Sequence, residues 1–174
     1  MAVAAGAAPD GFAAAVASLS GLWAGLVGTW LVGMGRQGPG RFRNVVGVRL
    51  TAQDVLVGVP AGLLAQLVVV PLLTLPVRLL QPDRDLSAEA RDLLDRADGA
   101  ALVVLVVLVV VASPIIEELF FRGPFQRTAV RRFPRRRARV FGALAQHYGR
   151  QGPAVIAHVA FNATTVTALQ AEWV

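Results

Sequence analysis

Long apolar runs alternate with short polar segments along this chain of 174 residues. Three of the runs, at residues 12–34, 55–80 and 100–122, are long enough to cross a bilayer, which takes about 20 apolar residues in a helix. A fourth run, shorter and more polar, follows at 153–170. The pattern therefore predicts an all-α, polytopic membrane helix bundle of about four transmembrane helices, with residues 1–174 forming a single integral-membrane domain.

A polar, net acidic segment at residues 81–99 separates the second and third runs. Its apolar residues recur at the spacing of one helix face: Leu86, Ala90, Leu93, Leu94 and Ala97. We therefore expect a short amphipathic surface helix that lies on the membrane or caps the bundle. Gly99 is expected to end it, because glycine favours helix termination.

Prolines interrupt two of the runs. Pro60, Pro71 and Pro76 lie in the second run, where neighbouring groups can satisfy the carbonyls that proline leaves without a donor. They predict kinks in that helix. The third run is rich in β-branched residues, but its length and flanks favour a membrane helix over a strand. Pro114 breaks the helical hydrogen-bond pattern there, just before two carboxylates.

Composition supports a chain that lies mostly in lipid. Hydrophobic residues make up 55% and charged residues 16%, below the roughly 25% usual for soluble domains. The chain contains no cysteine, which excludes disulfides and thiolate metal ligands. Its net charge is +6 and every basic residue is an arginine. Because aromatic residues are not interleaved with the arginines, we expect contact with anionic lipid headgroups and not with nucleic acid.

The arginines also predict an orientation. Segments 35–51 and 128–150 are basic, whereas the N-terminus and segment 81–99 are neutral or acidic. The positive-inside rule then predicts a multi-pass protein of the cell membrane, with both basic segments cytoplasmic and both termini outside. No arginine precedes the first run, and Asp10 lies just before it. We therefore interpret that run as a retained span and not as a signal peptide.

Candidate chemistry lies at the end of the third run, SPIIEELFFRG. Glu118 and Arg122 are spaced to pair along a helix, whereas Glu117 points about 100° away and is free to react. His158 and Asn162 share one face of the fourth run. Glu117 and His158 each lie about five residues from the same membrane face, roughly 7 Å deep. Two helices running in opposite directions would place them at equal depth.

A carboxylate and an imidazole beside an amide can activate a water molecule or hold a divalent metal. Glutamate would act as general base, histidine as ligand or acid, and asparagine as an oxyanion donor. Ionisable groups in a bilayer are costly and are therefore functional candidates. Two other interpretations stay open. The two glutamates with Arg122 could form an interfacial charge cluster, and His158 with Asn162 could hydrogen-bond between helices. His147 is expected to be an ordinary exposed histidine.

These residues resemble the motifs of the CAAX-processing and bacteriocin-processing (CPBP) family of intramembrane metalloproteases, also called type II CAAX prenyl proteases. The EExxxR motif of that family is matched by Glu117, Glu118 and Arg122, and its HxxxN motif by His158 and Asn162. The run GALAQHYGRQGPAVIAHVAFNA resembles the family's approach to its last helix. Neither motif alone is specific, but together and in order they are more so. The resemblance covers about residues 100–170.

The resemblance implies an activity and roles for the motif residues. Glu117 would be the carboxylate that activates water, and His158 would help to hold that water or a divalent metal. Zinc is the expected ion, with Glu117 and His158 as its ligands. Asn162 would support His158, and Glu118 and Arg122 would support the site. The implied reaction is hydrolysis of a peptide bond in a membrane-associated peptide or protein, near the cytoplasmic face.

One departure from the family pattern leaves the activity open. The family's middle motif, FxxxH, has no match, because Phe141 and His147 are six residues apart. A helical hairpin is missing between the two matched motifs, and the site would lack one imidazole. The chain is then either an intramembrane protease or a catalytically degenerate member, acting as a non-enzymatic immunity factor or assembly partner. A membrane scaffold that depends on its arginines is a third alternative.

Overall fold

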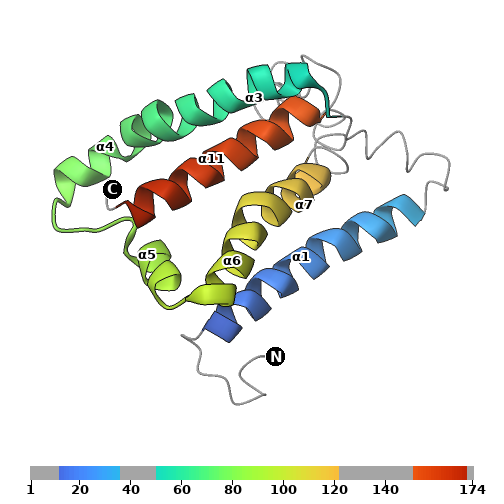
Figure 1. Cartoon of the computed structure of the whole chain (residues 1–174), viewed down its shortest axis with the longest axis horizontal. Coiled ribbons are helices and arrows are strands. Elements are labelled where there is room, and N and C mark those ends of the chain that lie inside the picture. The colour runs from blue at the N-terminus through green and yellow to red at the C-terminus, as the bar shows by residue number, and fades with distance from the viewer. Residues whose placement is uncertain (1–11, 36–49, 122–150, 172–174) are drawn as a thin grey trace.

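The computed structural model describes residues 12–35, 50–121 and 151–171 (Figure 1). Within these ranges every regular element is a helix, which confirms the predicted all-α class. The α-helices are α1 (Phe12–Gly35), α3 (Ala52–Leu64), α4 (Val70–Leu80), α5 (Ala88–Asp95), α6 (Gly99–Val107), α7 (Ser113–Phe120) and α11 (Gly152–Gln170). Two π-helical segments, η3 (Ala65–Val69) and η4 (Leu108–Ala112), join α3 to α4 and α6 to α7.

Four continuous helical rods are long and apolar enough to cross a membrane. They run over Ala13–Val32, Ala52–Leu80, Gly99–Phe120 and Gly152–Gln170, so each of the four predicted runs is a helix. Many of their leucine and valine side chains face outward, which is the surface that lipid chains would cover. By length and composition, the chain is a multi-pass membrane protein.

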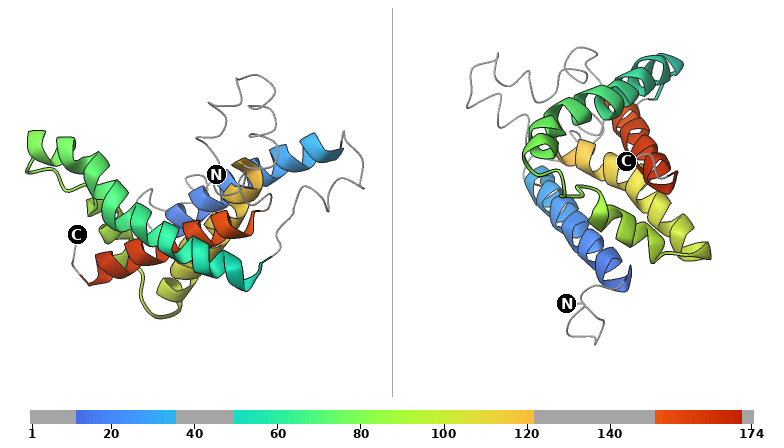
Figure 2. Two further views of the ribbon diagram at one scale, coloured as in Figure 1. Left: turned by 90° about the horizontal axis from the view of Figure 1, so that it is seen from above. Right: turned by 90° about the vertical axis from the view of Figure 1, so that its left-hand side faces the viewer.

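The segments α6, η4 and α7 form one continuous helix, the α6–α7 rod. The α11 helix lies between α3 and this rod, and α1 contacts α7 (Figures 1 and 2). Contacts along the helices give their directions. Residues of α3 and α11 meet in increasing order, so these helices are parallel. Along the α6–α7 rod, Val109 contacts Asn162, and the later residue Glu117 contacts the earlier residue His158, so this rod and α11 are antiparallel. The helix ends near residues 121 and 151 therefore lie at the same end of the bundle.

Two glycines allow α3 to approach α11 closely. A Cβ atom at Gly58 would lie 2.7 Å from the Ile156 side chain and 2.8 Å from the Pro153 carbonyl oxygen. One at Gly62 would lie 2.9 Å from the Phe161 backbone nitrogen and closer still to the Ala157 carbonyl oxygen. No larger residue fits against that backbone. The spacing is that of a GxxxG motif, in which glycine permits close packing of membrane helices.

The amphipathic helix predicted for residues 81–99 is α5, and it caps the end of the bundle away from residues 121 and 151. Leu94 of α5 is buried in one apolar cluster with Leu105, Val166 and Leu169. The expected end at Gly99 is wrong, because α5 ends at Asp95. Gly99 instead opens α6 with a φ of 47°, a left-handed conformation that glycine adopts without a side-chain clash.

The prolines at positions 71 and 114 each follow a π-helical segment, so the α-helical hydrogen-bond register changes just before each of them. In η4, the Ser113 N–H bonds to the Leu108 carbonyl, five residues earlier. The next partner in that register would be the Pro114 nitrogen with the Val109 carbonyl, but proline has no N–H to donate. The Val109 carbonyl therefore needs a donor from another helix, because a backbone carbonyl without a hydrogen bond is costly in lipid.

Replacing Gly62 should test the close packing of α3 on α11. Gly62→Ala places a methyl group against the α11 backbone, and we expect a loss of about 1–3 kcal/mol in the free energy of unfolding. The measurement is reversible unfolding in mixed micelles. Gly25→Ala on α1 is the matched control, because a Cβ there has no neighbour within 4 Å. Equal stability of the two variants would contradict the packing described.

Candidate functional site

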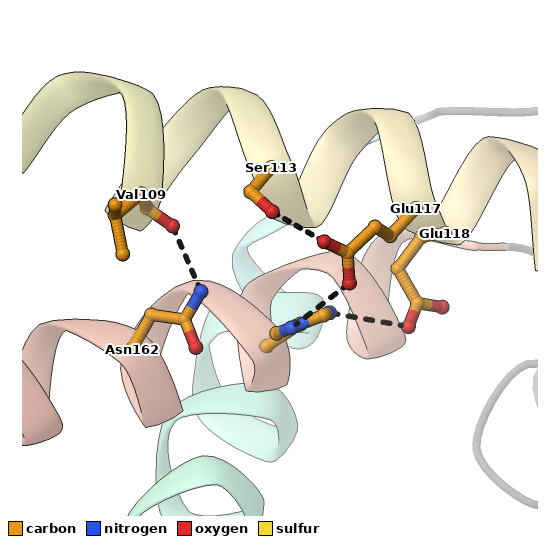
Figure 3. Close-up of polar contacts among 6 residues, drawn as sticks. Val109, Ser113, Glu117, Glu118 and Asn162 are labelled. Atoms are coloured by element: carbon orange, nitrogen blue, oxygen red, sulfur yellow. Dashed lines mark hydrogen bonds and ion pairs between the residues drawn. The ribbon is translucent and has the colours of Figure 1, made fainter. Parts of the chain in front are cut away.

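The predicted acidic pair and the predicted histidine meet at the contact between α7 and α11 (Figure 3). Nε2 of His158 lies 3.9 Å from Oε2 of Glu117. Nδ1 of the same ring lies 3.5 Å from Oε1 of Glu118. The imidazole therefore has a carboxylate beside each of its two nitrogens. The structure thus brings together three of the five site residues predicted from sequence.

The two carboxylates differ in how far they are sheltered. The Glu118 side chain is 12% exposed, compared with 29% for Glu117 and 26% for His158. Glu118 is therefore suited to holding the ring, whereas Glu117 and the Nε2 side of His158 can be reached from outside. Glu117 was expected to be the freer of the two glutamates because Glu118 would pair with Arg122, and that expectation stays a prediction.

The Glu118 carboxylate lies beside Nδ1 of His158 and can fix the orientation of the imidazole. Nε2 of the ring is then directed at Glu117. Glu118 was expected to pair with Arg122, which lies outside the described residues. A contact between Glu118 and His158 was not predicted.

Ser113 also belongs to the site, although the sequence analysis did not single it out. Its hydroxyl donates a hydrogen bond to Oε1 of Glu117, one helical turn further along. Ser113 is buried, with 8% of its surface exposed. A serine four residues before a glutamate on a helix is the signal that could have identified it, because residues at this spacing lie side by side.

Asn162 joins the two helices by a bond that does not involve the acidic pair. Its Nδ2 donates to the Val109 carbonyl oxygen at 2.8 Å, which satisfies the carbonyl that Pro114 leaves without a donor. Of the two interpretations left open for Asn162, this contact is the one between helices. The amide group carries a second N–H, and the predicted role as an oxyanion donor would have to use it.

An apolar pocket of about 160 Å³ lies next to Asn162, between α5, α6 and α11. Val109 and Asn162 line it, but Glu117 and His158 do not. His158 thus lies about one helical turn from Asn162, and Glu117 lies about two turns beyond Val109, towards the end of α7.

The donor set fits a divalent metal in part. A carboxylate oxygen and an imidazole nitrogen 3.9 Å apart can share one zinc ion, which lies about 2.0–2.2 Å from each ligand. Protein zinc sites use three or four protein ligands. Among the residues that the structure describes, no three His, Cys, Asp or Glu side chains are arranged to hold a metal. Glu117 and His158 thus supply two ligands, and the divalent metal stays a prediction.

Some of the sequence predictions fall outside the described ranges. Arg122 of the first motif, His147 and the arginines of segment 128–150 all lie there. Their expected roles stay predictions.

No protein-family model, curated protein or solved structure matches this chain. The resemblance to CPBP proteases therefore depends on the motif residues and on their placement. Glu118 of the first motif and His158 of the last are 40 residues apart in sequence, yet their side chains belong to one cluster.

Replacing Asn162 should test the bond between α11 and the α6–α7 rod. Asn162→Leu removes the donor and leaves the Val109 carbonyl unsatisfied, so we expect a loss of about 1 kcal/mol in the free energy of unfolding. Thr167→Ala is the matched control, because its hydroxyl bonds only within α11, to the Ala163 carbonyl. Unfolding in mixed micelles measures both. If Asn162→Leu is as stable as Thr167→Ala, the bond contributes nothing.

Proposed function

We propose that this chain is an intramembrane metalloprotease of the CPBP type, which hydrolyses a peptide bond in a membrane-associated substrate. The observation that carries the proposal is the position of His158 between Glu117 and Glu118. A water molecule beside Glu117 and Nε2 of His158 would meet a general base and a polar partner at one point. This is the geometry that general base catalysis of hydrolysis requires.

The reaction can be written with the residues of this chain. Glu117 takes a proton from the water, and the water oxygen bonds to the peptide carbonyl carbon. His158, with Nδ1 held by Glu118, orients the water through Nε2. The carbon–nitrogen bond then breaks, and the amine nitrogen receives the proton from Glu117. The products are a carboxyl group and an amine, and the Glu117 carboxylate is regenerated.

Carboxylate and imidazole ligands are compatible with zinc, and Glu117 and His158 would hold it. When bound, it would supply Lewis acidity that makes a bound water more acidic and polarises a carbonyl.

The proposed site faces the cytoplasm. Segments 36–49 and 122–150, which connect the helix ends nearest the site, contain four and nine arginines respectively. Such segments remain on the cytoplasmic side of membranes. Both chain termini would then be outside, and anionic lipid headgroups would contact the arginines. The substrate would be cleaved close to the cytoplasmic surface.

One observation favours a second candidate function. The described residues supply two metal ligands where a catalytic zinc site uses three. A catalytically degenerate member of the family, acting as a non-enzymatic immunity factor or assembly partner, would keep the helix bundle and the polar cluster without hydrolysing peptides.

Replacing Glu117 should separate these functions. For purified protein in liposomes, with membrane-tethered peptides as substrates, Glu117→Gln should lower the cleavage rate about 10²–10⁴-fold, because it removes the general base. Mass spectrometry of new peptide termini measures the rate. Glu89→Gln on the exposed surface of α5 is the control and should cleave as the wild type does. A wild-type chain that cleaves no peptide and binds no zinc would support the degenerate function.

The orientation can be tested with single cysteines, because the natural chain has none. Leu50 precedes α3 at the site end of the bundle, and Asp83 follows α4 at the other end; both are exposed. In intact cells, a membrane-impermeant thiol reagent should label Asp83→Cys and should label Leu50→Cys only after permeabilisation. The reverse pattern would place the site outside.

A further inference from the structure

We propose that Ser113 is a positioning residue for Glu117. The inference rests on the proposed function for its meaning in catalysis. The hydrogen-bond arrangement itself can be measured without any substrate.

The residues involved lie on the facing sides of two helices (Figure 3). Val109, Ser113 and Glu117 follow one another at four-residue spacing along the α6–α7 rod. Asn162 and His158 are four residues apart on α11. Asn162 contacts Val109, and His158 contacts Glu117. Within the α6–α7 rod, the Ser113 hydroxyl donates to Glu117.

A hydroxyl on a helix has an alternative acceptor, the backbone carbonyl four residues earlier. The threonines of α11 use it. Thr164 donates to the Ala160 carbonyl at 2.8 Å, and Thr165 donates to the Phe161 carbonyl at 3.0 Å. For Ser113 the equivalent acceptor is the Val109 carbonyl. Ser113 departs from the local pattern, because its hydroxyl points forward to a carboxylate instead.

The nature of the acceptor accounts for this departure. The Ser113 hydroxyl donates to the Glu117 carboxylate, and hydrogen bonds to an ionised acceptor are stronger than those to a neutral one. The Val109 carbonyl takes its hydrogen bond from Asn162 instead.

The consequence is a fixed carboxylate. Ser113 holds Oε1 of Glu117, and Oε2 then faces Nε2 of His158 at 3.9 Å. Without Ser113, the carboxylate could rotate away from the histidine. Small displacements of a catalytic group can lower rates by about 10²-fold.

Infrared spectroscopy of the purified chain in bilayers tests the hydrogen bond between Ser113 and Glu117. The difference between wild type and Glu117→Gln identifies the carboxyl bands of Glu117. We expect these bands to shift in Ser113→Ala, to return in Ser113→Thr, and to stay in place in the control Thr167→Ala. Bands that do not move in Ser113→Ala would overturn the positioning role.

The failure of this inference and the failure of the proposed function give different results. If the bands shift as expected but no variant or wild type cleaves peptides, the positioning is correct and the protease proposal fails. If the wild type cleaves, Ser113→Ala should lower kcat by about 10–100-fold with little change in KM, because Glu117 is still present but poorly placed. Cleavage by the wild type and an unchanged kcat in Ser113→Ala would reject the positioning role alone.

Discussion

The structure depends on one requirement of the bilayer, that backbone groups have hydrogen-bond partners within the protein because lipid offers none. Pro114 violates this requirement locally, since its missing N–H leaves the Val109 carbonyl without a donor in the π-helical register. Nδ2 of Asn162, on α11, donates a hydrogen bond to this carbonyl oxygen at 2.8 Å. That bond fixes the register of α11 against the α6–α7 rod. Because the helices are antiparallel, the same register places His158 one turn further along, beside Glu117 and Glu118.

The position of α11 has a second determinant on its other side. Gly58 and Gly62 remove the side chains that would separate α3 from the α11 backbone. The helix carrying His158 is thus held by close packing on one face and by a polar bond on the other. Close packing and an interhelical hydrogen bond are the interactions by which helices associate in a membrane. The hydrophobic effect contributes little there, because lipid chains are as apolar as the helix surfaces.

The sequence predicted the number of spans, because run length against bilayer thickness is a direct physical constraint. It also predicted equal depth for Glu117 and His158, which helical rise fixes. It did not predict the contact of Glu118 with Nδ1, because spacing along one helix does not say where a ring from another helix will lie. Ser113 was missed for a related reason. Its ordinary acceptor is a backbone carbonyl, whereas here its hydroxyl donates to the Glu117 carboxylate. The end of α5 was misplaced because glycine can open a helix as well as end one, and Gly99 opens α6.

The contacts of His158 are harder to explain by packing than those of Asn162. An amide that satisfies an orphaned carbonyl has a structural purpose in any membrane bundle. An imidazole between two carboxylates has no such purpose, since burying charged groups costs several kcal/mol and apolar residues of similar size often serve stability equally well. The interfacial charge cluster considered from sequence would place these groups towards headgroups and water. Instead, Glu118 is largely buried and directed at the ring, and Glu117 is restrained by a buried serine. Restraint of this kind opposes the freedom that an exposed, snorkelling carboxylate would have. It is what a reacting group requires, because catalysis depends on a base held in place before the substrate arrives.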